Sequence, residues 1–450
     1  MKRTARCCVL ALLLPAVVAG QTPSIPIVDT LSLEAALQLA VEQNVSLQTA
    51  RLQIEKADEE VAVARTRRLP SFETSATASE LLTPVGFTFP AGAFGVYPGT
   101  GPIPSTDMQI TTPRQPTAYL SAQVSQPLSQ LVRVGLGIRS AATGRDIERE
   151  RLRAQRLSLV STVKRLYFAI LQTESALAAS NDAIELYREL DRTIQQRVVQ
   201  KVALRSDALD VQFRLVKEEL ERTTHTNTLA SQKEQLNQLL GRDVRTAFDV
   251  ERVPEMSLLD VDLEAAQSRA LKSRPDVEEA RLRLKQAELD YRLKKSDRIP
   301  EVSLTLSYSS YFNMDVLPRN LAVAGVQMKW EPFDWGRTGR QLAVRAHTVE
   351  QARHSVREAE DRALLEVSDR FRKLAEARAF LSVAHVAQQA AQEKLRVKTN
   401  QFQIQAALLS EVLQVRAEVS DADDQRQQAL LAFWAAKANL EHALGEEVIR

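Results

Sequence analysis

Cysteine and glycine are scarce in this 450-residue chain, and each shortage excludes a class of function. The only cysteines are Cys7 and Cys8, so the chain after residue 20 has no thiol for a disulfide or for nucleophilic catalysis. The 14 glycines form no phosphate-binding loop and no serine nucleophile elbow. A net charge of only +2 provides no basic surface for nucleic acid. The sequence therefore predicts no enzyme, no cofactor and no nucleic-acid partner.

Histidine is also rare, with five residues in the whole chain. His347 and His354 are seven positions apart and would share a helix face, but no third histidine extends that stripe. Packed or solvated helix residues are the expected role, and no metal site is predicted.

Residues 1–20 have the pattern of a secretory signal peptide. Lys2, Arg3 and Arg6 precede a short apolar run, and small residues follow it at 18–20. The alternative is a membrane anchor, but the run is shorter than the ~20 residues needed to span a bilayer. We therefore expect an exported protein, and no later run of 18 apolar residues predicts a transmembrane helix.

Residues 340–444 contain no proline and no glycine, and apolar residues recur there at helical spacing. We expect two antiparallel helices with a break within 401–410. The first would have about 65 residues and a length of about 100 Å at the usual helical rise. Residues 145–240 lack the same two residue types.

The chain contains an internal duplication. Residues 33–70 align with 263–300 at a shift of 230, with 11 of 38 positions identical, and Leu240-Gly241 aligns with Leu444-Gly445 at a shift of 204. We expect two structural repeats, each with a helical segment, a strand pair and a long helical hairpin. Their bounds are 21–262, with a long loop at 80–118 and a hairpin at 135–240, and 263–450, with strands at 301–332 and a hairpin at 336–445.

The first helical segment of each repeat ends at a proline, Pro70 or Pro300, because the ring cannot continue a helix. Pro275 divides the second of these segments into a short helix and a longer one.

Alternating residues after Pro300 predict strands. Val302, Leu304, Leu306 and Tyr308 share one face, and so do alternate residues from Ala322 to Trp330. Strands of 9–11 residues suit a tilted transmembrane strand, and Tyr308 and Trp330 suit membrane interfaces. A half-buried soluble sheet is the alternative.

Four strands leave open edges, which cannot face lipid. If the strands span a membrane, several chains must pool them, and three chains would give twelve. Residues 80–118 would then form a loop on the outer face of the barrel. This loop would either serve recognition or be a solvated loop without such a role. The predicted fold is mainly α, with long helical hairpins and four strands per protomer that complete a twelve-stranded barrel.

Two motifs resemble the TolC-like outer-membrane efflux protein family. Leu33, Ala36, Leu37, Ala40, Asn44, Leu47 and Ala50 are spaced as in its first helix. Residues 330–337, Trp-Glu-Pro-Phe-Asp-Trp-Gly-Arg, are similar to its strand-to-helix turn, usually Phe-Asp-Gly-Gly-Arg, with Trp335 in place of one glycine.

The resemblance implies a homotrimer with a twelve-stranded barrel in the Gram-negative outer membrane and a helical tunnel in the periplasm. It implies a passive duct of a tripartite efflux or type I secretion system. Its partners would be outer-membrane lipid, a periplasmic adaptor and an inner-membrane transporter. Drugs, metals and proteins remain alternative substrates.

The resemblance also implies roles for the tips of the helical hairpins. Lys201, Val202, Gln405 and Ala406 would contact the adaptor, with Lys201 and Gln405 at glycine positions of the family. Asp207, Phe402, Glu411 and Gln414 would line the periplasmic aperture. The family's Tyr and Arg links to the aspartate cannot form, because Phe402 lacks a hydroxyl and Ala407 replaces the arginine.

Our hypothesis for Glu411 is a threefold acidic ring at the constriction, where three carboxylates repel one another and favour cations. The alternative is a solvated residue near a helix N-terminus. For the whole chain, the alternative is a periplasmic helical scaffold or adaptor without a barrel.

Overall fold

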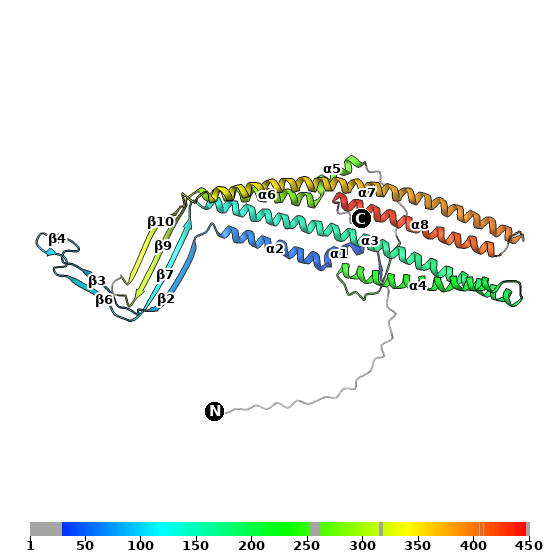
Figure 1. Cartoon of the computed structure of the whole chain (residues 1–450), viewed down its shortest axis with the longest axis horizontal. Coiled ribbons are helices and arrows are strands. Elements are labelled where there is room, and N and C mark those ends of the chain that lie inside the picture. Colours follow the sequence, from blue (N-terminus) through cyan, green and yellow to red (C-terminus); the bar gives the residue numbers. More distant parts are fainter. Residues whose placement is uncertain (1–28, 253–261, 315–317, 405, 408, 447–450) are drawn as a thin grey trace, which may run out of the picture.

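The computed structural model describes residues 29–252, 262–314, 318–404, 406–407 and 409–446. The molecule is elongated, with a β-sheet toward one end and long helices that run to the other (Figure 1). The expected signal peptide at 1–20 and the tip residue Gln405 lie outside the described residues.

Two helices run nearly the whole length of the helical part. Helix α3 has 69 residues and α7 has 67, so each is about 100 Å long. This confirms the helix length expected from the run without proline and glycine. The helices are α1 (Leu33–Gln43), α2 (Val45–Thr66), α3 (Leu131–Val199), α4 (Arg205–Leu240), α5 (Leu263–Ser273), α6 (Pro275–Lys295), α7 (Arg337–Gln403) and α8 (Leu409–Leu444), with a 3-10 turn η1 (Ser296–Arg298).

The main sheet is antiparallel with the order β10-β9-β7-β2, so β2 and β10 are its open edges. Its strands are β2 (Ser71–Glu80), β7 (Pro116–Pro127), β9 (Glu301–Phe312) and β10 (Asn320–Lys329). A separate parallel pair joins β1 (Asp29–Leu31) to β8 (Phe248–Val250).

The register gives this sheet two different faces. One row across it is Phe72, Val124, Leu306 and Ala324, and all four side chains are apolar. The opposite face is rich in hydroxyl groups, and the Oγ atoms of Ser75 and Ser121 lie 2.7 Å apart across two strands. The predicted alternation is confirmed.

The segment between β2 and β7, expected as a long loop, forms a small β arm. Strand β3 (Val85–Phe89) pairs with β6 (Met108–Thr112), and β4 (Val96–Tyr97) pairs with β5 (Gly101–Pro102). The arm continues the molecule beyond the end of the main sheet (Figure 1). The many prolines of this segment led to the prediction of a loop. Val85, Phe87 and Phe89 nevertheless alternate as strand residues do.

The first helical segment, expected as one helix over 33–68, is broken at Asn44. The Asn44 backbone is extended, and its Oδ1 accepts hydrogen bonds from the Ser46 and Leu47 amides at 2.9 and 3.2 Å. This is an N-cap, which starts α2 as a separate helix. In the second half the break at Pro275, between α5 and α6, is where the sequence predicts it.

The largest buried cluster surrounds the middle of α3. Tyr167 and Phe168 pack there with Leu37, Leu236 and Leu240. The Tyr167 hydroxyl lies 2.9 Å from the Leu31 carbonyl oxygen and 2.8 Å from that of Glu251, and burial raises the pKa of Tyr167 to about 12. The cluster therefore fixes α3 against the ends of β1 and β8.

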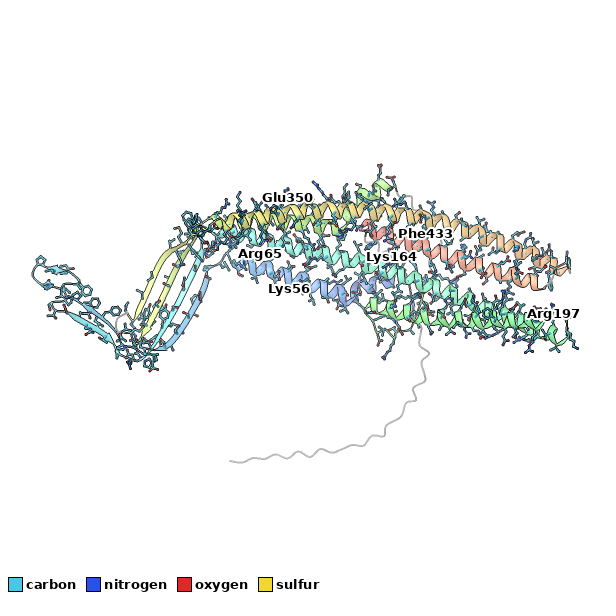
Figure 2. The ribbon with its side chains drawn as sticks, in the orientation of Figure 1. Lys56, Arg65, Lys164, Arg197, Glu350 and Phe433 are labelled. Atoms are coloured by element: carbon cyan, nitrogen blue, oxygen red, sulfur yellow. The ribbon has the colours of Figure 1, made fainter. Side chains whose placement is uncertain are left out.

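A buried ion pair joins α3 to α8. The Lys164 Nζ lies 2.6 Å from a Glu441 carboxylate oxygen, and the two side chains are 7% and 17% exposed. Lys164 and Phe433 are labelled near the middle of the helical part in Figure 2. Lys437 on α8 also lies 4.0 Å from a Glu441 carboxylate oxygen, so the pair belongs to a small group of charges between the two helices.

Candidate functional site

The two helical hairpins turn at the end of the molecule opposite the sheet (Figure 1). The first turn lies between α3 and α4, at residues 200–204, and the second lies between α7 and α8. The described residues that the family resemblance assigns to the aperture and to adaptor contact lie in these turns or in the adjoining helix ends.

The first turn closes around Lys201 in a left-handed conformation. Lys201 has φ +60°, and the Val202 amide donates to the Arg197 carbonyl at 2.9 Å. This is a Schellman-type helix end, whose left-handed position favours glycine. The sequence placed Lys201 at a glycine position, and the backbone geometry explains why glycine suits it.

Asp207 fixes the start of α4. Its Oδ2 accepts a hydrogen bond from the Leu204 backbone amide at 3.3 Å, and its own amide donates to the Leu204 carbonyl at 3.2 Å. A carboxylate also suits the positive end of a helix. Within one chain, Asp207 therefore acts as a cap.

The second turn has a backbone hydrogen bond equivalent to one in the first turn. The Ala406 amide donates to the Gln401 carbonyl at 2.8 Å, and both positions are 204 residues beyond Val202 and Arg197. Phe402 is exposed just before the end of α7, at 42%, and Gln414 is exposed on α8.

Glu411 has a cationic partner that sequence reasoning missed. The Lys398 Nζ on α7 lies 3.1 Å from a Glu411 carboxylate oxygen, and both side chains are partly exposed. Lys398 and Glu411 are nearly equidistant in sequence from the break between α7 and α8, so a hairpin that turns there brings them together. Their equal spacing from the break could have predicted this ion pair. Lys394 and Glu418 form a second pair across the same hairpin.

Trp330 and Tyr308 lie toward opposite ends of the apolar face. Tyr308 is opposite Ala322, and its hydroxyl is 3.0 Å from the Asn320 Oδ1. Trp330 follows the other end of β10 and is 55% exposed. Trp330 is eight positions beyond residue 322, which corresponds to about 26 Å along a strand.

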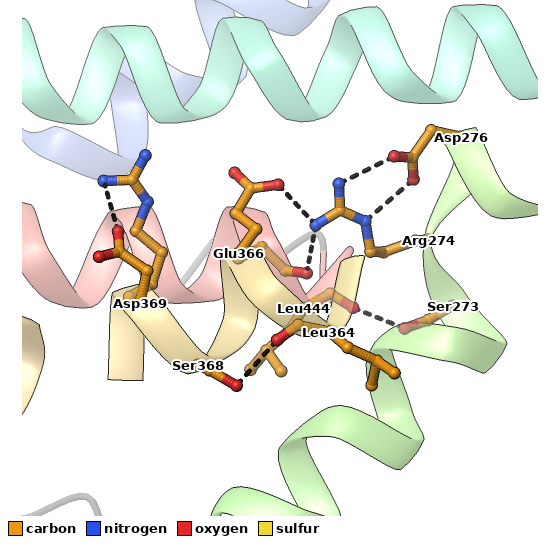
Figure 3. A network of polar contacts seen from close by, with 10 residues as sticks. Ser273, Arg274, Asp276, Leu364, Glu366, Ser368, Asp369 and Leu444 are labelled. Carbon is orange, nitrogen blue, oxygen red and sulfur yellow. Dashed lines mark hydrogen bonds and ion pairs between the residues drawn. The ribbon is translucent and has the colours of Figure 1, made fainter. Parts of the chain in front are cut away.

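A polar clasp that the sequence did not predict fastens the end of α8 (Figure 3). Arg274 binds Asp276 with two nitrogens at 2.9 and 2.8 Å, Glu366 at 2.8 Å and the Ala443 carbonyl at 3.1 Å. Burial disfavours the Asp276 carboxylate, but Arg274 outweighs burial and holds the pKa of Asp276 below its usual value.

The first half has an uncharged counterpart of this clasp. The Asn44 Nδ2 donates to the Leu239 carbonyl at 2.9 Å. Leu239 is the penultimate residue of α4, as Ala443 is of α8. In each half, the end of the second hairpin helix therefore contacts the break in the helical segment of the same half, at Asn44 or at Arg274.

Within the described residues, no cluster of three histidine, cysteine or acidic side chains is arranged to hold a metal ion. The helices of the described segments also include none that is long and apolar enough to cross a membrane.

Residues 36–242 and 266–446 match the outer membrane efflux protein family. An uncharacterised protein of Haemophilus influenzae is 24% identical over 192 residues, a match that spans 42% of this chain and 42% of that relative.

Solved structures have a similar fold. A Pseudomonas aeruginosa membrane protein has a TM-score of 0.75 at 18% identity and covers 93% of this chain and 91% of its own. The CmeC outer membrane channel of Campylobacter jejuni has a TM-score of 0.75 at 15% identity, with 92% and 85% covered. The MtrE outer membrane channel of Neisseria gonorrhoeae, in its open state, has a TM-score of 0.70 at 18% identity, with 92% and 89% covered.

Proposed function

Since the chain belongs to the outer membrane efflux protein family, we propose that it forms, as a homotrimer, the passive outer-membrane duct of an efflux or secretion system. The observation that carries the proposal is the main sheet, which has one apolar face, one polar face and two unpaired edges. Open edges do not exist in lipid, so the edges must pair with other copies. Three copies supply twelve strands, an even number within the range of membrane barrels.

The helical part continues the duct into the periplasm in this proposal. Helices α3 and α7 supply a length of about 100 Å. The hairpin tips, with Lys201, Val202, Gln405 and Ala406, dock onto a periplasmic adaptor, and an inner-membrane transporter provides the energy. The duct itself performs no catalytic step and needs no cofactor.

Two structural repeats, 21–262 and 263–450, are part of the same proposal. Both halves place a broken helical segment, two strands and a long hairpin in the same order. The equivalent contacts of Asn44 and Arg274 with the ends of α4 and α8 support this division.

Trp330 and Tyr308 would mark the two membrane interfaces. Their separation of about 26 Å along strands tilted by about 40° spans about 20 Å across the membrane, which is most of an apolar band about 25 Å tall. The periplasmic interface would then lie at the helix end of the sheet.

The aperture assignment also remains a proposal, with Asp207, Phe402, Glu411 and Gln414 at the constriction. Three Glu411 carboxylates would form a ring that attracts cations. Each Lys398 ammonium lies 3.1 Å from a Glu411 carboxylate oxygen and offsets part of the negative charge of that ring.

Electron microscopy of the detergent-purified protein tests the duct. We expect threefold end views and an elongated tail of about 100 Å. Planar bilayer recordings should show ion conductance. Monomers that stay in solution without detergent would contradict the proposal and favour a periplasmic scaffold.

A further inference from the structure

Two aromatic side chains are strongly exposed where β10 passes into α7. Trp335 is 90% exposed and Phe333 is 68% exposed. Their ring centroids are 4.9 Å apart in an edge-to-face arrangement with an interplanar angle of 63°. The pair is preorganised, yet almost none of the Trp335 surface is buried within its own chain.

Trp335 also has an unfavourable backbone conformation. Its φ is +55°, and the next residue, Gly336, is left-handed as well, with φ +83°. Asp334 shapes the turn, because its carboxylate accepts hydrogen bonds from the Gly336 amide at 3.1 Å and the Thr338 amide at 2.8 Å. A left-handed residue other than glycine is strained, because its Cβ comes close to the following carbonyl oxygen. Burial of the indole inside the chain does not offset this strain.

The corresponding turn of the first half is built differently. There the Ser129 Oγ donates to the Pro300 carbonyl at 2.6 Å and accepts from the Val302 amide at 2.8 Å. Gln130 stands where the second turn has Trp335, when Pro127 is aligned with Pro332. The aromatic pair is therefore a feature of the turn that follows the open edge strand β10.

The apolar face of the sheet leads directly to this pair. Met328 and Trp330 belong to that face by strand alternation and are 64% and 55% exposed. Phe333 and Trp335 follow within five residues of Trp330. The apolar face and the aromatic pair are therefore adjacent in the chain at this end of β10.

We propose that Phe333 and Trp335 form a lipid anchor in the head-group region of the periplasmic leaflet of the outer membrane. This rests on the proposed function, since it requires the apolar face of the sheet to lie in lipid. An indole combines an apolar ring with an N–H donor, which suits the boundary between acyl chains and head groups. Transfer of Phe333 and Trp335 to that boundary compensates for the strain.

Lipid is favoured over a neighbouring copy because both rings are strongly exposed and follow Trp330, at the end of the apolar face, within five residues. A partner strand at the β10 edge would pair along the backbone of β10, which ends at Lys329. The turn that carries Trp335 lies beyond that end.

Fluorescence quenching by brominated lipids tests the anchor, because the chain has only three tryptophans, Trp330, Trp335 and Trp434. One variant keeps Trp335 alone, with Trp330→Phe and Trp434→Phe. A matched control keeps Trp434 alone, in α8 far from the sheet. A reference variant replaces all three with Phe and carries Tyr308→Trp on the apolar face. Each full-length protein is inserted into phosphatidylcholine vesicles brominated either near the head group or near the acyl-chain end.

We expect bromines near the head group to quench Trp335 about twofold more than bromines near the chain end, as for an interfacial residue. Trp434 should be insensitive to both, and the single indole of the Tyr308→Trp variant should be quenched. If Trp335 is as insensitive as Trp434 while the Tyr308→Trp variant is quenched, the anchor is overturned and the duct stands. If the Tyr308→Trp variant is also insensitive, the proposed function fails. Protection of Trp335 from both bromines and aqueous iodide would assign the pair to a contact between copies and would also overturn the anchor.

Trp335→Gly separates strain from anchoring, since glycine adopts the left-handed conformation at no steric cost. The helical fold should be at least as stable as in the parent. Extraction from vesicles by mild detergent should nevertheless become easier than for Trp335→Phe. Unchanged extraction of both variants would contradict the anchor.

Discussion

Gly241 lies so close to Gln43 that a Cβ atom at position 241 would be 2.3 Å from the Gln43 carbonyl oxygen. Its counterpart Gly445 is less confined, because a Cβ there would lie 3.0 Å from the Arg274 Cα. Both glycines have positive φ, at +74° and +73°. The ends of α4 and α8 therefore depend on glycine for both conformation and space.

Gly241→Ala should destabilise the protein more than Gly445→Ala. A left-handed alanine costs about 1–2 kcal/mol at either position, and the backbone overlap at Gly241 adds to that cost. Gly336→Ala is the matched control, since Gly336 has φ +83° and open space around its Cα. Denaturant unfolding monitored by circular dichroism measures all three. Equal losses would show that the Gln43 approach relaxes without cost.

Lys201→Gly should stabilise the first hairpin turn. Relief of the left-handed strain at Lys201 is worth about 1 kcal/mol, which corresponds to roughly fivefold slower hydrogen exchange at the Val202 amide. Lys201→Ala removes the same charge but keeps the strain, so its exchange rate should stay near that of the parent. Faster exchange in the glycine variant would mean that the Lys201 side chain itself supports the turn.

His442→Gln should reduce the loss of stability in mild acid. Burial lowers the pKa of His442 below 6.5, with Glu366 acting against the shift and Arg274 with it. As the pH falls below that value, the unfolded chain takes up a proton before the folded one does, so folding stability is lost. The variant removes this contribution.

Denaturation midpoints of parent and His442→Gln, measured between about pH 7 and about pH 5, check this prediction. The Asp276 carboxyl does not interfere, because its pKa is lowered from 3.8 and its own contribution is lost only at more acidic pH. Identical pH slopes for both proteins would contradict a role for His442.

Glu411→Gln should lower the preference of the open channel for cations, and Lys398→Gln should raise it. The first change removes charge from the proposed ring, and the second removes the ammonium 3.1 Å from it. Permeability ratios in planar bilayers measure both. Lys394→Gln is the control, because Lys394 is paired with Glu418 farther from the turn. Ratios that do not change in either of the first two variants would rule out the ring.

Local sequence patterns predicted most of the fold. The long helices followed from the absence of proline and glycine, the strand faces followed from period-two alternation, and the α5–α6 break followed from Pro275. The Asn44 break had a local signal that was not used, since asparagine is a preferred N-cap and Asn44 aligns with Arg274, the residue before Pro275. The contact of Asn44 with the Leu239 carbonyl, 195 positions away, had no such signal. No local pattern encodes a contact at that separation.

The candidate site was less predictable than the fold. Motif resemblance located the turns and Asp207, but the turn conformation around Lys201 and the partner of Glu411 depend on how the helices pair. Likewise, the contacts of Arg274 could not be predicted from the sequence, because its partners come from three different helices, α6, α7 and α8.

Only three residues, 128–130, separate β7 from α3, and α3 then runs without a break to Val199. The helix is held at its sheet end by the Ser129 hydrogen bonds to Pro300 and Val302, and at its middle by the cluster around Tyr167. A tilt of ~3° at that end displaces the far end by ~5 Å over a helix of this length. A tilt of α3 as a whole, with the helices packed on it, would therefore move the hairpin turn much farther than it moves the strands.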